Sequence, residues 1–169
     1  LFVLRMDGGE ARQLTKHEES IGSYRWGPDG ESLYFVANMA RSADRQKEFE
    51  KGDDAIFVDE GPNGQRSARW QSLWKASAKD GKITRLTRDS LRIGGFEVSP
   101  EGDRILLSAR YENRRNQGNL SELFMLTIAD SSLTQLTRND APEGRLTWAP
   151  GGESLAFVAA DDTDWELRN

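Results

Sequence analysis

The sequence predicts an all-β fold, a partial β-propeller of about three four-stranded antiparallel blades whose ring does not close within the 169 residues. The first observation is a unit of about 37 positions that recurs three times without a gap, starting at Leu1, Leu73 and Leu123. The second is that each unit contains four apolar runs of strand length, separated by turn residues. The third is one spacing: in each copy a Leu-Thr pair precedes a proline by fourteen residues, at Leu14 and Pro28, Leu86 and Pro100, and Leu136 and Pro150.

The first copy shows why each run is expected to be a strand. LFVLRM and ARQLT flank Asp7-Gly8-Gly9 and predict a hairpin. GSYRWGP places Tyr24 and Trp26 two residues apart, so they share one face of a strand. We expect Trp26, like Trp148 in the same slot of the third copy, to be a core residue.

The turn and the strand that follow complete the blade. Pro28 presets φ for a β-turn, and Gly30 tolerates the positive φ with which such turns end. SLYFVAN is apolar on both phases, which predicts a strand with other layers on both faces.

The strands of each blade are lettered A to D from the propeller axis outward, in chain order. The expected units are an outer C–D pair at 1–15, a blade at 23–87 with an insertion at 38–71, a blade at 94–137, an inner A–B pair at 145–159, and the start of a further strand at 164–169. A β-sandwich is the competing fold. Since natural propellers close with about four to eight blades, we expect a piece of a longer ring; association of two chains into a six-bladed ring is the alternative.

Length variation is confined to the B–C links, at one end of the blades, which marks that end as the candidate binding face. The long insertion predicts a short helix near 43–51, an extra strand AIFV and a turn GPNG. A solvated hairpin extension without a function is the alternative for this segment. The candidate interface or gating residues are Asp53, Asp54, Asp59, Glu60, Arg69, Trp70, Arg114 and Arg115.

Composition excludes several classes of protein. A net charge of −5 with no Lys/Arg block argues against nucleic acid, and no apolar run reaches the ~18 residues of a membrane span. The absence of cysteine excludes disulfides and thiolate chemistry, and leaves a bacterial cytoplasm and a periplasm equally open.

No catalytic, cofactor-binding or metal-binding residue is expected in this chain. His17 is the single histidine and lies in a loop, and no G-x-S-x-G motif accompanies it. The acidic run near Asp53 lacks the spacing of a twelve-residue calcium loop. Carboxylate pairs for glycoside hydrolysis remain open among 28 acidic residues, but none stands out.

Two motifs resemble a known class. WGPDGESLYFVA and WAPGGESLAFVA resemble the W-S-P-D-G-x-x-I-A-F element of TolB-like propeller repeats, and LFVLRMDGGEARQLT resembles their partner element. Both recur in the N-terminal propeller of prolyl oligopeptidase-family serine peptidases, in the acylaminoacyl-peptidase and dipeptidyl-peptidase branches. The charged insertion, followed by LWKASAKDGKITRLT, is similar to bacterial members of that family. Gly151 departs from the motif where Asp or Glu is usual, but a tight turn should survive.

The resemblance implies a substrate-gating propeller that admits short peptides to an α/β-hydrolase domain absent from this chain. The expected partners are therefore the missing blades, that catalytic domain and a peptide substrate, with self-association through exposed blade edges. A non-catalytic TolB-like interaction propeller is the alternative. A propeller enzyme such as a polysaccharide lyase is a third, for which a single histidine is poor support.

Overall fold

The structure is a computed structural model that describes residues 1–52, 69–113, 120–139 and 141–160. Antiparallel strands and one short helix make up its regular structure in these ranges. They are β1 (Phe2–Val3), β2 (Arg12–Gln13), β3 (Ile21–Trp26), β4 (Ser32–Asn38), α1 (Ala43–Glu50), β5 (Gln71–Ser77), β6 (Ile83–Arg85), β7 (Arg92–Val98), β8 (Arg104–Arg110), β9 (Glu122–Thr127), β10 (Ser132–Gln135), β11 (Glu143–Trp148) and β12 (Leu155–Ala159).

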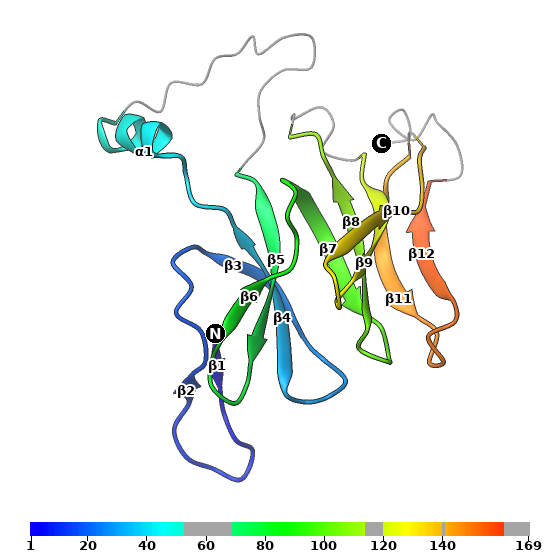
Figure 1. Cartoon of the computed structure of the whole chain (residues 1–169), viewed down its shortest axis with the longest axis horizontal. Helices are drawn as coiled ribbons and strands as arrows, with labels where there is room; N and C mark the ends of the chain where they lie inside the picture. Colours follow the sequence, from blue (N-terminus) through cyan, green and yellow to red (C-terminus); the bar gives the residue numbers. More distant parts are fainter. Residues whose placement is uncertain (53–68, 114–119, 140, 161–169) are drawn as a thin grey trace.

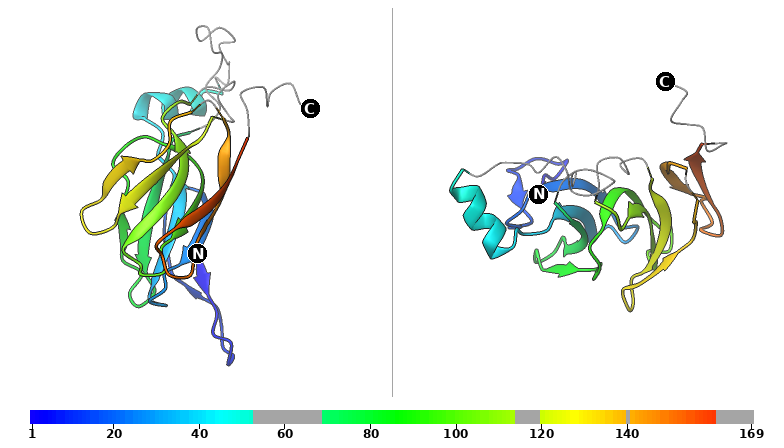
Figure 2. Two further views of the ribbon diagram at one scale, coloured as in Figure 1. Left: turned by 90° about the vertical axis from the view of Figure 1, so that its right-hand side faces the viewer. Right: turned by 90° about the horizontal axis from the view of Figure 1, so that it is seen from above.

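The strands form separate sheets that stack side by side (Figures 1 and 2). Two sheets have four strands in the orders β3-β4-β5-β6 and β7-β8-β9-β10. The pairs β1-β2 and β11-β12 form the remaining sheets at either end of the stack. Strand order equals chain order in every sheet, as in a propeller blade, so the predicted open arc of blades is confirmed.

The core lies between the sheets, and the second strand of each complete blade contributes to two interfaces. Tyr34 and Val36 of β4 pack with β7, β8 and β9, while Phe35 and Ala37 pack on the opposite side. On β8, Ile105 and Leu107 likewise face β4, whereas Leu106 faces β11. The expectation that these strands are covered on both faces is therefore confirmed for β4 and β8.

Strands β3 and β12, toward the two ends of the arc, lack such cover. Trp26 is 47% exposed, so its assignment to the core was wrong, whereas Trp148 packs on the cluster of Leu106 and Leu123. The reason is position: the sheet on the β3 side consists of β1 and β2, the outer pair of a blade, which leave the inner strand β3 uncovered. On the opposite end Val158 of β12 is 56% exposed.

The Pro-x-Gly turns connect neighbouring blades as well as neighbouring strands. Gly102 has φ +72°, which favours glycine, and a Cβ at this position would lie 3.0 Å from Cγ of Pro28 in the preceding blade. Gly152 and Pro100 repeat the arrangement one blade later. In the third turn Gly152 N still donates to Ala149 O at 2.8 Å, so the tight turn survives Gly151 as predicted.

The Leu-Thr pair also has a structural role. Leu86 N donates to Leu73 O at 2.8 Å, and the buried hydroxyl of Thr87 accepts from Leu73 N at 3.0 Å. Thr137 accepts from Leu123 N in the same way, at 2.8 Å. The pair therefore binds the end of the outermost strand to the start of the third strand, whose first amide would otherwise lack an acceptor.

The insertion begins after β4, and α1 forms where a short helix was expected. The expected AIFV strand, the GPNG turn and the strand start at 164–169 lie outside the described residues.

Candidate binding pocket on the innermost strands

Each innermost strand carries a β-bulge near its start. The register shifts between Ile21 and Tyr24 in β3, between Ile93 and Gly95 in β7, and between Gly144 and Thr147 in β11. A glycine stands eight residues after the repeat leucine in all three copies, at Gly22, Gly94 and Gly144. Bulges re-aim side chains and are frequent beside functional sites.

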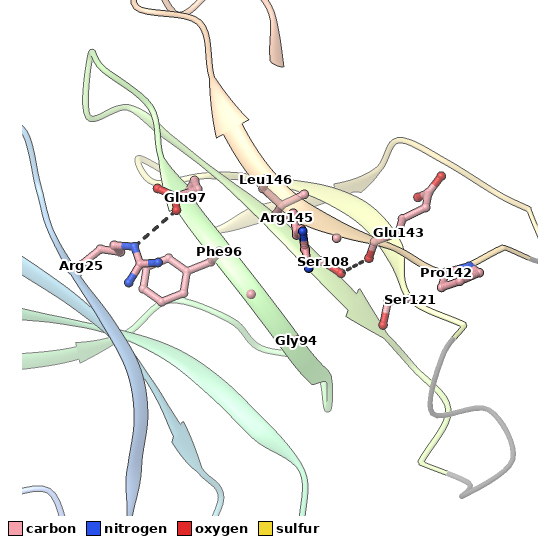
Figure 3. Close-up of a pocket in the computed structure, with 12 residues that line it drawn as sticks. Arg25, Gly94, Phe96, Glu97, Ser108, Ser121, Pro142, Glu143, Arg145 and Leu146 are labelled. Atoms are coloured by element: carbon pink, nitrogen blue, oxygen red, sulfur yellow. Dashed lines mark hydrogen bonds and ion pairs between the residues drawn. The ribbon is translucent and has the colours of Figure 1, made fainter. Parts of the chain in front are cut away.

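A pocket of about 610 Å³ lies between the starts of β7 and β11. Figure 3 shows its walls: Phe96 and Glu97 on one strand, Arg145 and Leu146 on the other. The starts of these strands lie at the blade end from which β4 leads into the insertion, because Ile21 at the start of β3 pairs with Ala37. The pocket is therefore at the end that the length variation marked as the candidate binding face.

Glu143 fixes the position of β11 against β8. Its carboxylate accepts hydrogen bonds from Thr137 Oγ1 and from Asn139 Nδ2, the latter at 2.7 Å. Its main-chain carbonyl accepts from Ser108 Oγ at 2.6 Å, across the pocket floor (Figure 3). Because this carboxylate is buried and already doubly bonded, Glu143 holds the pocket wall in place.

The open part of the pocket is bordered by charged side chains. Arg25 of the preceding blade forms an ion pair with Glu97, with Nε and Oε1 3.3 Å apart. Arg145 is exposed and forms no hydrogen bond or ion pair with any residue that the structure describes. Its φ of +52° is unusual for a residue with a side chain and costs about 1–2 kcal/mol. A strained, exposed guanidinium at a pocket wall is a candidate ligand for an anionic group.

Two further arginines lie near the pocket residues along β7 and β8 but do not line the pocket. Arg92 and Arg110 pair across β7 and β8, next to Gly94 and Ser108. Burial lowers the pKa of both guanidinium groups, and repulsion from Arg92 lowers the pKa of Arg110 further. Both remain cationic at neutral pH. Arg92 donates to the carbonyl of Arg69, and Arg110 Nε donates to the carbonyl of Glu112.

Of the residues proposed from sequence, Arg69 and Trp70 are described, and both anchor the base of the insertion. Arg69 pairs with Glu19 and its carbonyl accepts a hydrogen bond from Arg92, while the carbonyl of Trp70 accepts from Met39 N at 2.8 Å. Neither lines the pocket. The other candidates lie outside the described residues: Asp53, Asp54, Asp59, Glu60, Arg114 and Arg115.

The pocket residues Gly95, Glu143, Gly144 and Arg145 were missed by sequence reasoning. The glycine that recurs eight residues after the repeat leucine was the available signal for the bulge. Nothing in the sequence distinguished Arg145 from other surface arginines.

The pocket contains no residue pair suited to serine hydrolase chemistry. The chain's only histidine, His17, packs against Trp74 with ring centroids 4.8 Å apart, and its Nδ1 accepts from Glu19 N at 3.2 Å. Among the described residues no three His, Cys, Asp or Glu side chains cluster as metal ligands, and no helix is long and apolar enough to cross a membrane.

The fold and the pocket thus define an arc of a β-propeller with a candidate ligand pocket on its innermost strands. A curated relative, an uncharacterized peptidase (YuxL) of Bacillus subtilis, is 27% identical over 118 residues, which are 64% of this chain and 18% of that protein. Among solved structures, a protein assigned as TolB from Agrobacterium tumefaciens superimposes with a TM-score of 0.58 at 20% identity, over 96% of this chain and 46% of that one. TolB from Acinetobacter baumannii gives a TM-score of 0.42 at 15% identity, over 90% and 41%. No family model matches the chain.

These similarities confirm the resemblance inferred from the motifs, a peptidase propeller with TolB-like repeats. The Agrobacterium structure bears on the fold alone. The chain spans less than a fifth of the length of the curated peptidase that it matches.

Proposed function

We propose that this chain is the substrate-gating propeller segment of a serine peptidase whose catalytic α/β-hydrolase domain lies in another part of the parent protein. The observation that carries the proposal is the 118-residue similarity to a peptidase of which this chain spans 18%. The parent's substrates would be short peptides, or N-terminal aminoacyl or dipeptidyl groups.

The architecture supports a gating role. The pocket opens between innermost strands, and the insertion that holds α1 leaves from the same end of the blades. A ring of such blades presents its inner strands to a central channel, and a folded protein is wider than such a channel. A propeller of this kind would therefore admit short or extended peptides and exclude folded proteins.

Exposed apolar faces toward the two ends of the arc support the expectation that blades of the parent protein are missing from this chain. Tyr24 and Trp26 at one end, and Val158 at the other, occupy positions that a neighbouring blade covers in the middle of the arc. In the isolated chain we expect these faces to drive self-association. Light scattering across a concentration series measures it; a monomer at all concentrations would contradict the expectation.

The proposal is tested on the full-length parent protein. A fluorophosphonate probe should label one serine outside these 169 residues, and labelling should abolish hydrolysis of chromogenic aminoacyl and dipeptidyl substrates. The full-length protein should cleave short peptides and should not cleave folded proteins that contain the same peptide sequences. A parent protein that binds no probe and cleaves no peptide would overturn the proposal and favour a TolB-like interaction propeller.

A further inference from the structure

Two of the glycines that line the pocket have neither a steric clash at Cβ nor a left-handed φ, although Gly144 lies at the bulge of β11. A Cβ built on Gly95 or Gly144 meets no atom within 4 Å, and neither residue has a φ in the left-handed region. Gly81 differs, because its Cβ would lie 2.6 Å from a main-chain oxygen of Leu14. Glycine inside a strand, without a steric or conformational need, is typical of a place where another main chain approaches closely.

Both glycines lie on free strand edges. β7 is the edge of its four-stranded sheet, and β11 is the edge of the pair β11-β12. Edge strands present unpaired N–H and C=O groups, which an extended peptide satisfies by adding alongside them. The glycines leave the faces of these edge strands free of side chains where the two strands border the pocket.

Arg145 supplies a charged group beside the same opening. Its guanidinium has no hydrogen-bond or ion-pair partner within the described ranges, although the positive φ of its backbone is unfavourable. The same slot holds Ser23 and Gly95 in the other copies, neither of which has a positive φ. The positive φ is therefore particular to β11, one of the two strands that line the pocket, as expected where a side chain serves recognition.

We infer that this pocket binds a short extended peptide, with its main chain against Gly95 and Gly144 and a carboxylate on Arg145. The inference rests on the proposed function for the class of ligand, and it assigns the site and the residues. The volume of about 610 Å³ lies within the range of roughly 300–1,000 Å³ usual for small-ligand pockets. The carboxylate has two sources, the peptide's C-terminus and an Asp or Glu side chain.

The test is fluorescence anisotropy of this chain with an N-terminally labelled alanine pentapeptide. Three probes differ only in their charge: a free C-terminus, an amidated C-terminus, and an amidated C-terminus with a central aspartate. The neutral probe should bind at least tenfold more weakly than one or both charged probes. Which charged probe binds identifies the source of the carboxylate, and equal binding of all three would overturn the role of Arg145.

Variants locate the site. Arg145→Gln should weaken binding of the preferred charged probe about tenfold or more and leave the neutral probe unchanged. Gly95→Ala and Gly144→Ala should each weaken all probes several-fold. Gly22→Ala is the matched control, since Gly22 holds the slot of Gly144 in the first blade, outside the pocket, and its Cβ would make only an ordinary 3.7 Å contact.

The alanine variants should melt at the same temperature as the unsubstituted chain or slightly above it, which separates loss of the site from loss of the fold. Equal effects of Gly22→Ala and Gly144→Ala, or no binding of any probe, would overturn the inference. Peptide binding by this chain together with an unlabelled, inactive parent would overturn the proposed peptidase function and leave this site standing. A catalytically active full-length protein, together with no peptide binding by this chain, would leave the proposed peptidase function standing and overturn this site.

Discussion

The hydroxyl of Thr87 offers the sharpest test of how the repeat is held together. Thr87 is 2% exposed and accepts a hydrogen bond from the amide of Leu73, which is fully buried. Thr87→Val keeps the size and shape of the side chain but removes this acceptor. A buried amide without a partner costs about 1–3 kcal/mol, so we expect the free energy of unfolding to fall by about 2 kcal/mol.

Thr87→Ser is the matched comparison, because it keeps the acceptor and removes only a buried methyl group, at a cost of roughly 0.8 kcal/mol. Urea unfolding followed by tryptophan fluorescence measures both variants, at a concentration where light scattering shows no change in association. In a chain of this length, 2 kcal/mol corresponds to a fall in Tm of roughly 4–8 °C. If the valine variant proves as stable as the serine variant, or more stable, packing rather than the hydrogen bond holds the repeat, and the reasoning is refuted.

Three further predictions concern turns and buried hydroxyls. Gly151→Asp should stabilise the chain by about 1 kcal/mol, because it restricts the unfolded state at a position with open space around it. Gly152→Asp should destabilise the chain by about as much, because Gly152 has a φ of +71°. Thermal melts of the two variants compare neighbouring sites in one turn. Ser72→Ala should stabilise the chain by about 1 kcal/mol, since the buried Ser72 hydroxyl has no partner among the described residues. Ser108→Ala should destabilise the chain, since the Ser108 hydroxyl donates to a buried carbonyl at 2.6 Å. Urea titrations measure the sign of both effects. The hydrogen bond from the Ser32 hydroxyl lowers the pKa of Asp29. The stability that this hydrogen bond contributes is therefore present above the ordinary carboxyl pKa of about 4 and is lost as the pH falls below that value. Asp29→Asn should flatten this part of the pH–stability curve.

Each of these predictions has a distinct contrary result. Equal melting temperatures for Gly151→Asp and Gly152→Asp would show that φ does not decide the turn. A destabilised Ser72→Ala would show that its hydroxyl has a partner in solution. A pH–stability curve unchanged in Asp29→Asn would show that this carboxylate has the same proton affinity in the folded and unfolded chain.

The repeat geometry explains why stability and ligand binding involve different residues. Neighbouring blades are joined at one end of their strands by the contacts Pro28–Gly102 and Pro100–Gly152. The pocket lies at the opposite end, where the bulges of β7 and β11 begin and where the insertion departs. Substitutions in the pocket therefore leave the inter-blade turns intact, as the binding experiments require.

The sequence by itself determined the fold class, the strand order and the turn positions. Apolar runs of strand length, turn residues between them and a fixed spacing are local properties, and three copies of one pattern left little freedom in how each blade folds. The short helix at Ala43–Glu50 lies outside the repeat and was expected from the charged first half of the insertion.

Only the tertiary structure decided which repeat positions are buried and which form the pocket. Trp26 and Trp148 hold the same slot, yet one is exposed and the other packed, because burial depends on the neighbouring sheet and not on the strand's own residues. Arg145, Gly95 and Gly144 come together from two blades, about fifty positions apart in the chain. A one-dimensional pattern predicts each blade well, but the space between two blades depends on the stacking of both.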